Sequence, residues 1–300
     1  MDKLNVLSLF DGMGCGRLAI DRVGLPIENY FASEIDNVAI KVTTAKYHNN
    51  IHLGDVTTIQ SSNLPKIDLL IGGSPCQGFS FAGKQLNFED PRSKLFFEFV
   101  RLLKETKPKY FLLENVNMKQ EYQDIITEHL EVTPIRINSS LVSAQFRDRL
   151  YWTNIPVVPI ENRQIVFNNI KDTYVDSSLY IPSKYSFTIN NKIPTNSSKP
   201  IRLGGYMKQG QGQRIYSMDG KSVCLSALGG GWGAKTGLYL DGSNVRKPTI
   251  KELCRLQTVP DNYFDGLGLT YPQIAKMLGN GWTVDVIAHI LKGILNASNI

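Results

Sequence analysis

The fold of this chain is decided by one stretch, LLIGGSPCQGFS, which spans residues 69–80. The apolar run from Asp68 to Ile71 is typical of a buried strand, and the two glycines after it allow a sharp turn. Pro75 fixes one backbone torsion just before Cys76. A cysteine at the edge between a strand and its loop lies where an α/β protein places a nucleophile. A buried structural thiol is the alternative, but the turn-forming and polar neighbours of Cys76 favour the nucleophile.

The N-terminal residues predict a site for a nucleotide cofactor. Residues 4–10 are expected to form a strand, followed by the turn DGMGCG and a helix from Arg17 to about Val23. Glycines in such a turn let the backbone approach a ligand closely. A second strand ends at Glu34, 20 residues after Gly14, where a carboxylate can accept both ribose hydroxyls. A surface carboxylate at a strand end is the alternative for Glu34. Ile35 is expected against an adenine face, and Asp55 near its amino group.

The rest of the first half alternates strands with helices. An amphipathic helix is predicted over 92–106, followed by a buried strand over 110–113 that delivers Glu114 at its end. Further strands are expected over 134–139 and 150–155, and helices over 248–257 and 283–295. This alternation indicates an α/β fold with a doubly wound, mostly parallel sheet.

Composition excludes several classes of protein. The 300 residues are 42% hydrophobic and 20% charged, which is ordinary for a soluble globular protein. The start has no basic region followed by an apolar one, and no apolar run approaches the roughly 20 residues of a membrane helix. The 4 cysteines are far apart, and His48 and His52 have no third ligand type near them. We therefore expect no membrane span, disulfide framework or metal site, and a reducing, cytoplasmic location.

The positive charge is concentrated in one segment. Residues 157–248 contain 12 Lys/Arg against 5 Asp/Glu, whereas the rest of the chain has 21 against 22. This distribution favours a module that binds a polyanion, attached to a near-neutral catalytic part of the chain. A basic surface that faces only solvent is the alternative interpretation. A linker is the alternative for this loop-rich region, but its interleaved aromatic residues favour a small folded module. The predicted domains are 1–170 plus 270–300, which bind the cofactor, and 171–269, which recognise the target.

Six motifs in order resemble those of the cytosine-C5 DNA methyltransferases of bacteria and phages, over nearly the whole chain. LFDGMG at 9–14 resembles the methyl-donor motif, and SPCQ at 74–77 the nucleophile motif. ENV at 114–116 and QFRDR at 145–149 resemble the two motifs that bind the substrate base. Residues 246–257 resemble the helix that organises the recognition domain, and LGNGW at 278–282 the motif that closes the cofactor site. The resemblance implies a Rossmann-like methyltransferase with a smaller, irregular, mainly β DNA-recognition domain.

The resemblance also assigns site residues. Catalysis is assigned to Cys76, Glu114, Arg147 and Arg149. Binding of the cofactor S-adenosylmethionine is assigned to residues of the motifs and of the predicted strand ends and helix: Phe10, Gly12, Met13, Gly14, Glu34, Ile35, Asp55, Val56, Pro75, Leu95, Asn280 and Trp282. DNA contacts are assigned to a second set: Gln77, Ser80, Phe81, Lys84, Gln145, Gln211, Arg214, Cys224 and Gly230.

The implied reaction begins with addition of the Cys76 thiolate to C6 of cytosine, which makes C5 nucleophilic. Glu114 would hold N3 and the amino group, and Arg149 would bind O2, with Arg147 as orienter or phosphate contact. Because no side chain reaches C6 in a stacked duplex, the base must be flipped out, and residues 77–84 are expected to close over it. Arg214 and Gln211 are expected to enter from the side opposite to this loop, and Arg214 is expected to contact a guanine edge.

The recognition stretch is similar to that of family members that read short G/C-rich palindromes. Two positions depart from the pattern: Cys224 stands where a threonine is usual in GCGC-type members, and Trp282 where bacterial members have a small aliphatic residue. Double-stranded DNA is the expected partner, with a restriction endonuclease for the same site as a second one, and the chain is expected to be a monomer.

Two other functions stay open from the sequence. A tRNA cytosine-C5 methyltransferase is built from the same motifs, although its recognition region differs from the stretch around Gln211 and Arg214. A catalytically silent DNA-binding homologue is the other, and the presence of every chemical residue speaks against it. An amino-group methyltransferase is disfavoured, because its chemistry needs a different loop where this chain has Pro75-Cys76.

Overall fold

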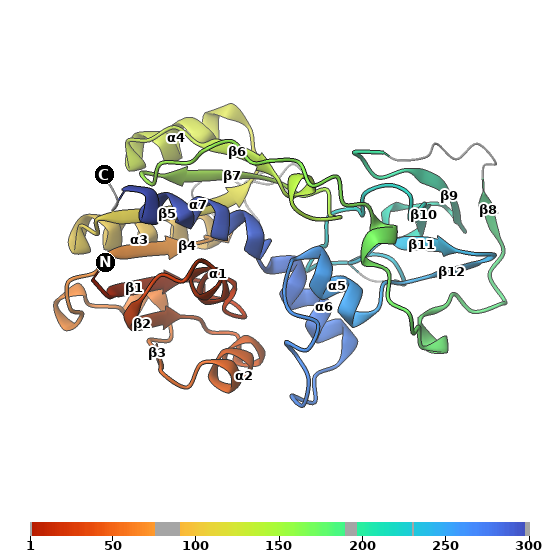
Figure 1. Ribbon diagram of the computed structural model, residues 1–300, viewed down its shortest axis with the longest axis horizontal. Coiled ribbons are helices and arrows are strands. Elements are labelled where there is room, and N and C mark those ends of the chain that lie inside the picture. The colour runs from red at the N-terminus through yellow and green to blue at the C-terminus, as the bar shows by residue number, and fades with distance from the viewer. Residues whose placement is uncertain (1, 76–90, 190–196, 230, 298–300) are drawn as a thin grey trace. The chain divides into compact units, whose positions relative to one another are not determined.

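The structure is a computed structural model, and it describes residues 2–75, 91–189, 197–229 and 231–297 (Figure 1). The chain divides into two compact units. The first contains residues 1–137, 148–159 and 287–300, and the second contains residues 138–147 and 160–286.

The first unit is built on a seven-stranded sheet in the order β3-β2-β1-β4-β5-β7-β6. Its strands are β1 (Leu4–Leu9), β2 (Ile27–Ser33), β3 (Asn50–His52), β4 (Leu69–Gly72), β5 (Tyr110–Val116), β6 (Ile135–Asn138) and β7 (Asp148–Thr153). The pairs from β3 to β5 are parallel, whereas β7 runs antiparallel to β5. The predicted doubly wound, mostly parallel sheet is confirmed. Its strand order reverses between β1 and β4, and the carboxyl ends of strands at such a point form a crevice where ligands bind.

Four helices connect the strands of this sheet, and a fifth ends the chain. They are α1 (Cys15–Val23), α2 (Asn37–Lys46), α3 (Pro91–Thr106), α4 (Gln120–Leu130) and α7 (Val284–Ala297). Gly14 and Gly24 bound α1 in the left-handed conformation, with φ of 84° and 78°, which glycine adopts without strain. Helix α1 begins two residues before the predicted Arg17, while α2 and α4 were not predicted.

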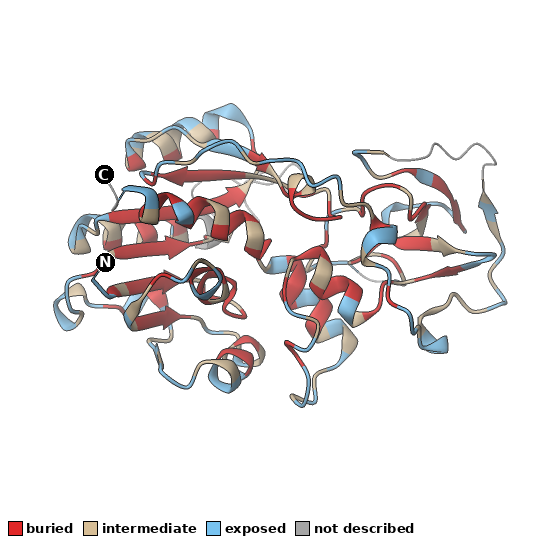
Figure 2. Ribbon diagram, viewed as in Figure 1, coloured by how far each residue is buried: buried red, intermediate tan, exposed pale blue. Residues whose placement is uncertain are grey.

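The core of the first unit lies where the apolar strands meet the helices. Figure 2 shows the central strands β1, β4 and β5 as mostly buried, whereas the edge strands β3 and β6 are mainly exposed or half-buried. The fully buried members of this core include Leu7, Leu9, Leu70, Phe96, Phe99, Leu113 and Trp152. Phe99 also explains a glycine at the end of β4, because a Cβ on Gly72 would lie 3.0 Å from its ring. The sequence therefore keeps the end of β4 free of side chains just before the nucleophile motif.

The second unit contains a five-stranded sheet in the order β12-β11-β10-β9-β8. Its strands are β8 (Phe187–Ile189), β9 (Arg202–Tyr206), β10 (Arg214–Tyr216), β11 (Leu238–Asp241) and β12 (Asn244–Arg246). Only β10 and β11 pair in parallel among these strands. Tyr206, Ile215, Leu238 and Val245 form a buried cluster. The basic region is thus a folded, mainly β module, and the linker interpretation is wrong for its described residues.

Two helices complete the second unit, α5 (Ile250–Leu256) and α6 (Tyr271–Asn280). Pro248 was expected in the first turn of α5, but it precedes the N-cap residue Thr249, whose side chain accepts from the Glu252 amide. Glu252 also binds the fully buried Arg246 through two bonds of 2.7 and 2.8 Å, from β12 to α5. A paired, bidentate geometry is what makes such a buried charge tolerable.

Among the helices that the structure describes, none combines the length and the apolar character that a membrane crossing requires.

Candidate active site

The glycine-rich turn after β1 forms a tight cradle at the carboxyl ends of β1 and β2. Phe10, Gly12 and Gly14 have positive φ angles of 57°, 58° and 84°. The amide of Asp11 donates to the carbonyl of Ser33 at 3.0 Å, which ties the turn to the end of β2. Met13 is buried beneath the turn. The positive φ at Phe10, which is uncommon outside glycine, shows how sharply the backbone turns here.

Glu34 closes one side of this cradle. Its Oε2 accepts from the amide of Gly12 at 2.8 Å, and its Oε1 accepts from the amides of Ile35 and Asp36, each at 2.8 Å. The carboxylate is therefore fixed next to the turn. The side chain of Ile35 is 72% exposed, which leaves an apolar surface beside a fixed carboxylate.

Asp11 is a site residue that the sequence interpretation did not include. Its Oδ1 accepts from the Ser8 hydroxyl at 2.6 Å and from the Tyr30 hydroxyl at 2.7 Å. Its Oδ2 is buried and has no hydrogen-bond partner. Burial raises the pKa of Asp11 to about 6, and the two hydrogen bonds oppose this rise. The only sequence signal was an acidic residue directly before a turn glycine.

Asp11→Asn is expected to change how stability depends on pH. Because burial raises the folded-state pKa of Asp11 from 3.8 to about 6, this group stabilises the fold fully below about pH 4, and that contribution is lost as the pH rises through 6. The unfolding free energy of the wild type minus that of Asp11→Asn should fall by about 3 kcal/mol between pH 4 and 7.5. Urea denaturation at both pH values measures this difference.

Asp176 provides a control of opposite sign for that experiment. Hydrogen bonds from Ser178 lower the pKa of Asp176, which is fully exposed. Asp176→Asn should therefore not reproduce the trend of Asp11→Asn. If the difference in unfolding free energy between the wild type and Asp11→Asn does not change with pH, the Asp11 carboxyl of the wild type is ionised in the folded chain at all these pH values.

The other predicted cofactor residues of the first unit lie on neighbouring elements. The Ser33 hydroxyl donates to the carbonyl of Gly54 at 2.8 Å, which holds the Asp55 segment beside the end of β2. Asp55 is exposed and caps the short helix that starts at Val56, which is buried. Leu95 on α3 is half-buried against the core. Pro75 is the last described residue before residue 91.

Glu114 and Arg149 form an ion pair at the ends of β5 and β7. In the antiparallel register Glu114 lies opposite Tyr151, so Arg149, two residues along β7, projects from the same face of the sheet. The Arg149 Nε lies 3.0 Å from the Glu114 Oε1, and the two side chains are only 13% and 10% exposed. The sheet geometry thus places a carboxylate and a guanidinium together with little water around them.

Next to this pair, β4 and β5 are joined at their carboxyl ends. The Asn115 Nδ2 donates to the Ser74 Oγ at 3.2 Å, and both residues are buried. Ser74 stands two positions before Cys76 in the chain. Five predicted residues of this loop lie outside the described residues: Cys76, Gln77, Ser80, Phe81 and Lys84.

Gln145, which was expected at the DNA, is fully buried in the second unit. Its Nε2 donates to the carbonyl of Leu256 and to Gln257 Oε1, both at 3.0 Å, and its Oε1 accepts from the amide of Leu225 at 2.8 Å. A side chain with all of these partners joins three segments that are far apart in the sequence. Its contacts are with protein groups.

Arg147, which was expected to take part in catalysis, is 3% exposed. It donates to the carbonyls of Leu225 at 3.3 Å, Gly279 at 3.2 Å and Gly281 at 2.9 Å. Its Nε is buried without a hydrogen-bond partner. Arg147 thereby holds the segment with the predicted cofactor residues Asn280, which is exposed, and Trp282, which is buried.

The predicted recognition residues lie on the module of the second unit. Gln211 is exposed in a short helix, and Arg214 begins β10, half-buried, with its Nε buried and unpaired. Cys224 is exposed, and the Arg147 Nη1 lies 3.4 Å from its sulfur. Gly230 lies outside the described residues.

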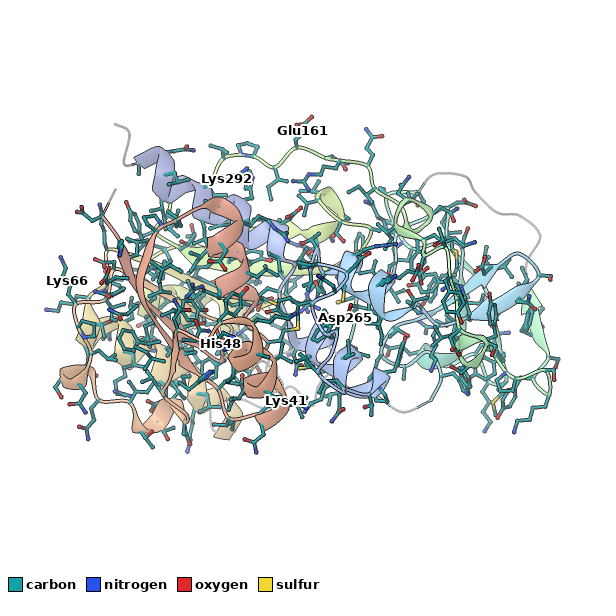
Figure 3. All side chains as sticks on the ribbon, turned by 60° about the horizontal axis from the view of Figure 1, so that its bottom comes forward. Lys41, His48, Lys66, Glu161, Asp265 and Lys292 are labelled. Carbon is teal, nitrogen blue, oxygen red and sulfur yellow. The ribbon has the colours of Figure 1, made fainter. Side chains whose placement is uncertain are left out.

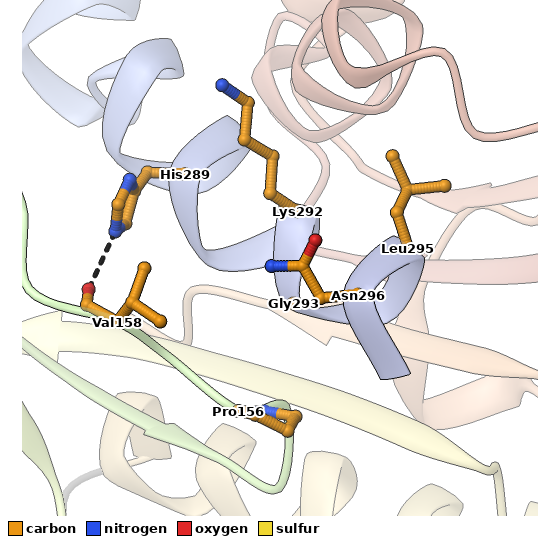
Figure 4. Close-up of a pocket in the computed structure, with 7 residues that line it drawn as sticks. All are labelled: Pro156, Val158, His289, Lys292, Gly293, Leu295 and Asn296. Atoms are coloured by element: carbon orange, nitrogen blue, oxygen red, sulfur yellow. Dashed lines mark hydrogen bonds between the residues drawn. The ribbon is translucent and has the colours of Figure 1, made fainter. Parts of the chain in front are cut away.

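The described residues contain no group of three His, Cys, Asp or Glu side chains that could hold a metal ion, and His48, labelled in Figure 3, is exposed. A cavity of about 220 Å³ lies between α7 and residues 156–158, where His289 donates to the carbonyl of Val158 at 2.8 Å (Figure 4). Pro156 follows β7, which runs antiparallel to β5. This cavity therefore lies toward the amino end of β5, whereas Glu114 lies near its carboxyl end.

Similar proteins of known fold support this description. A structure of the Entamoeba histolytica methyltransferase EhMeth matches with a TM-score of 0.79 and 19% identity, covering 99% of both chains. A putative DNA modification methyltransferase encoded within an E. coli prophage matches with a TM-score of 0.71 and 22% identity, covering 99% of this chain and all of that one. At these identities the likeness concerns the fold alone.

Sequence comparison identifies the family. The Type II methyltransferase M.HhaI of Haemophilus parahaemolyticus is 31% identical over 99% of this chain and 95% of its own length. M.NgoBI of Neisseria gonorrhoeae, another Type II methyltransferase, is 31% identical over 94% of this chain and 90% of its own length. The family model "C-5 cytosine-specific DNA methylase" matches residues 4–133 and 138–296. The chain therefore belongs to the C-5 cytosine-specific DNA methylase family and is a DNA (cytosine-5) methyltransferase.

Proposed function

We propose that this protein transfers a methyl group from S-adenosylmethionine to C5 of a flipped-out cytosine in a short, G/C-rich palindrome of duplex DNA. The main supporting observation is the buried Glu114–Arg149 pair, whose Nε and Oε1 are 3.0 Å apart. It lies at the end of β5, beside Ser74, which leads into Cys76. A carboxylate and a guanidinium side by side can bind the N3, amino and O2 edge of one pyrimidine.

The cradle fits S-adenosylmethionine by its chemistry. Glu34 offers a fixed carboxylate for ribose hydroxyls, and Ile35 offers exposed apolar surface for adenine. The buried, unpaired Oδ2 of Asp11 suits a ligand that carries a positive charge. When bound, the cofactor supplies an electrophilic sulfonium methyl group. The remaining contacts are assigned to Phe10, Gly12, Met13, Gly14, Asp55, Val56, Pro75, Leu95, Asn280 and Trp282.

Glu34→Ala is expected to raise the KM and the Kd for S-adenosylmethionine about 10- to 100-fold, with little change in kcat. The reason is that hydrogen bonds to a charged group contribute about 1.5–3 kcal/mol, and a ribose contact binds ground and transition states equally. Calorimetry measures the Kd without catalysis. Glu28→Gln is the control, because Glu28 is on β2, the strand that precedes Glu34, but pairs with Lys3 at 3.2 Å on the surface. Equal affinities of Glu34→Ala and the wild type would contradict this assignment.

The proposed chemistry starts from the Cys76 thiolate. It adds to C6 of the flipped cytosine, while Glu114 donates a proton to or shares one with N3 and Arg149 stabilises negative charge at O2. C5 thereby becomes an enamine carbon and takes the methyl group. As the methyl group moves to C5, the sulfonium keeps the bonding electrons and would leave as a neutral thioether. A base then removes the C5 proton, the electrons of that bond expel the Cys76 thiolate from C6, and the N3 proton returns to Glu114, which gives 5-methylcytosine.

Target recognition is proposed for the second unit. Its basic module supplies Gln211, Arg214, Cys224 and Gly230 as DNA contacts, and the loop with Gln77, Ser80, Phe81 and Lys84 closes over the base. The half-buried Arg214 with its unpaired Nε is suited to a guanine edge once DNA is present. The domain division at about residues 171 and 269, a monomeric state, a cytoplasmic location and a partner endonuclease belong to the same proposal.

We assign Gln145 and Arg147 a positioning role in this function. Both side chains are buried and bind backbone carbonyls and amides within the second unit. Removing either would leave several polar groups of that unit without a partner, so their variants should lose activity through altered structure.

Sequencing of DNA from cells that express the protein tests the proposed function most directly. Bisulfite treatment should reveal 5-methylcytosine at one short palindrome. Methylation of purified duplex DNA and of tRNA side by side tests the tRNA alternative, which would be correct if only tRNA were modified. Methylation of neither substrate would favour the silent homologue.

A further inference from the structure

Lys247, in the second unit, lies between two aromatic rings. Its Nζ is 4.5 Å from the centroid of the Trp232 ring and 4.6 Å from that of Tyr271. A lysine ammonium within about 6 Å of a ring face is attracted by the electrons of the ring. No carboxylate among the described residues forms an ion pair with Lys247. The two rings are thus the groups that hold this cation.

Trp232 belongs to a glycine-rich segment whose described residues, 226–229 and 231–235, are here called the recognition loop. The ends of this loop are joined by the Ser226 amide, which donates to the carbonyl of Lys235 at 2.9 Å. The amide of Gly233 donates to the carbonyl of Gly212 at 3.1 Å, next to the predicted DNA contact Gln211. The Trp232 ring packs on the buried cluster of the module. Any shift of Trp232 would therefore move the recognition loop and the Gln211 segment together.

We call Lys247 together with the rings of Trp232 and Tyr271 the clamp. The part of the clamp that holds Lys247 and Tyr271 is rigid. The Lys247 amide donates to the carbonyl of Leu179 at 3.0 Å. The Tyr271 hydroxyl donates to the carbonyl of Pro248, the residue after Lys247, at 2.9 Å. Arg246, the residue before, is held in the buried pair with Glu252. The residues before and after Lys247 are both held by hydrogen bonds, so the backbone of Lys247 is fixed. Its side chain can therefore restrict the movement of the Trp232 ring.

We propose that Lys247 is a positioning residue for target recognition, which holds the recognition loop through Trp232 and Tyr271 instead of binding a DNA phosphate. This inference rests on the proposed function of the second unit. In a basic DNA-binding module a lysine is ordinarily expected to bind a phosphate, and such a contact weakens all sequences alike when it is lost. Loss of a clamp has a different consequence, because a loosened loop discriminates less between sequences.

The first experiment uses the free protein and hydrogen exchange. Lys247→Met should speed exchange of the Trp232 and Gly233 amides about tenfold, since two cation–π contacts are lost. Tyr271→Leu should give a similar increase without removing the charge, and Lys247→Arg should restore protection. Unchanged exchange in Lys247→Met would refute the clamp. If Lys247→Met does not fold, Tyr271→Leu alone decides the result.

The second experiment uses DNA. Lys247→Met should lower about tenfold the ratio between kcat/KM for the target duplex and kcat/KM for a singly mismatched duplex. The slope of the logarithm of the DNA association constant against the logarithm of the salt concentration should stay that of the wild type. Lys208→Met, which removes an exposed lysine from the same module, is the charge-matched control and should keep the ratio. A Lys247→Met slope reduced by about one, with equal weakening of all sequences, would identify a phosphate contact and overturn the inference.

The two experiments separate this inference from the proposed function. A wild-type protein that methylates no DNA refutes the proposed function and the recognition role of Lys247, whereas hydrogen exchange still decides whether the clamp exists. Active wild type with an unchanged ratio in Lys247→Met refutes only the recognition role.

Discussion

Replacing Cys76 with alanine is expected to reduce the rate of methyl transfer by about 10⁴-fold or more, with DNA binding retained. Cytosine C5 is a poor nucleophile until a thiolate adds to C6, and alanine has no group that can make that addition. Methyl transfer from labelled cofactor to a target duplex measures the rate, and a gel-shift assay measures binding.

The other cysteines provide the controls for this experiment. Cys254 is fully buried, and burial raises its pKa to about 12, so its thiol stays protonated and unreactive. Cys254→Ala should therefore keep the activity. Cys224 is exposed and is the competing candidate for a reactive thiol.

A mechanism-based trap distinguishes these thiols chemically. With 5-fluorocytosine at the target position, the fluorine cannot leave as a proton does, so the C6–S bond should persist. Protein and DNA should then remain joined under denaturing conditions, and peptide mapping should place the bond at Cys76. Methylation by Cys76→Ala, or an adduct at Cys224, would contradict the proposed mechanism.

The sequence was sufficient to predict the central sheet, because its strands are short apolar runs that end in turn residues. The strand at 69–72 and the strand delivering Glu114 were both expected, and both are present. Helix α4 was missed although Tyr122, Ile126 and Leu130 have the spacing of a buried helical face. Helix α2 had a weaker signal, because its β-branched residues resemble a strand.

The motifs were sufficient to name candidate site residues, but they did not predict the hydrogen-bond partners of those residues. The spacing of the cradle indicated Glu34 as a ribose contact, whereas its bond to the Gly12 amide at 2.8 Å was not predicted. The partners of Arg147 include Leu225 and Gly279, which are 78 and 132 residues away, and no local pattern reveals such pairs. The parallel pairing of β10 with β11 is hidden for the same reason, since it depends on tertiary packing.

Glu114→Gln is expected to lower kcat about 10²- to 10⁴-fold, with a smaller loss of stability than Arg149→Ala, because Arg149 keeps its bond to the Asp148 carbonyl at 2.8 Å. Glutamine keeps the shape of the side chain and can still accept from Arg149, but it cannot carry a proton to N3. Single-turnover methylation measures the rate, and urea denaturation measures the stability. Asp148→Asn is the matched control, because Asp148 adjoins Arg149 on β7 and pairs instead with Arg136 at 3.0 Å. Its activity should stay near that of the wild type.

Arg149→Ala should behave differently, because it leaves the Glu114 carboxylate, only 10% exposed, without its cation. An uncompensated buried charge costs about 3–5 kcal/mol, so this variant should lose stability as well as activity. The double variant Glu114→Gln with Arg149→Ala should be more stable than Arg149→Ala alone, since no unpaired charge is left. If Glu114→Gln keeps full kcat while Arg149→Ala is destabilised, the pair is structural and the proton must come from another group.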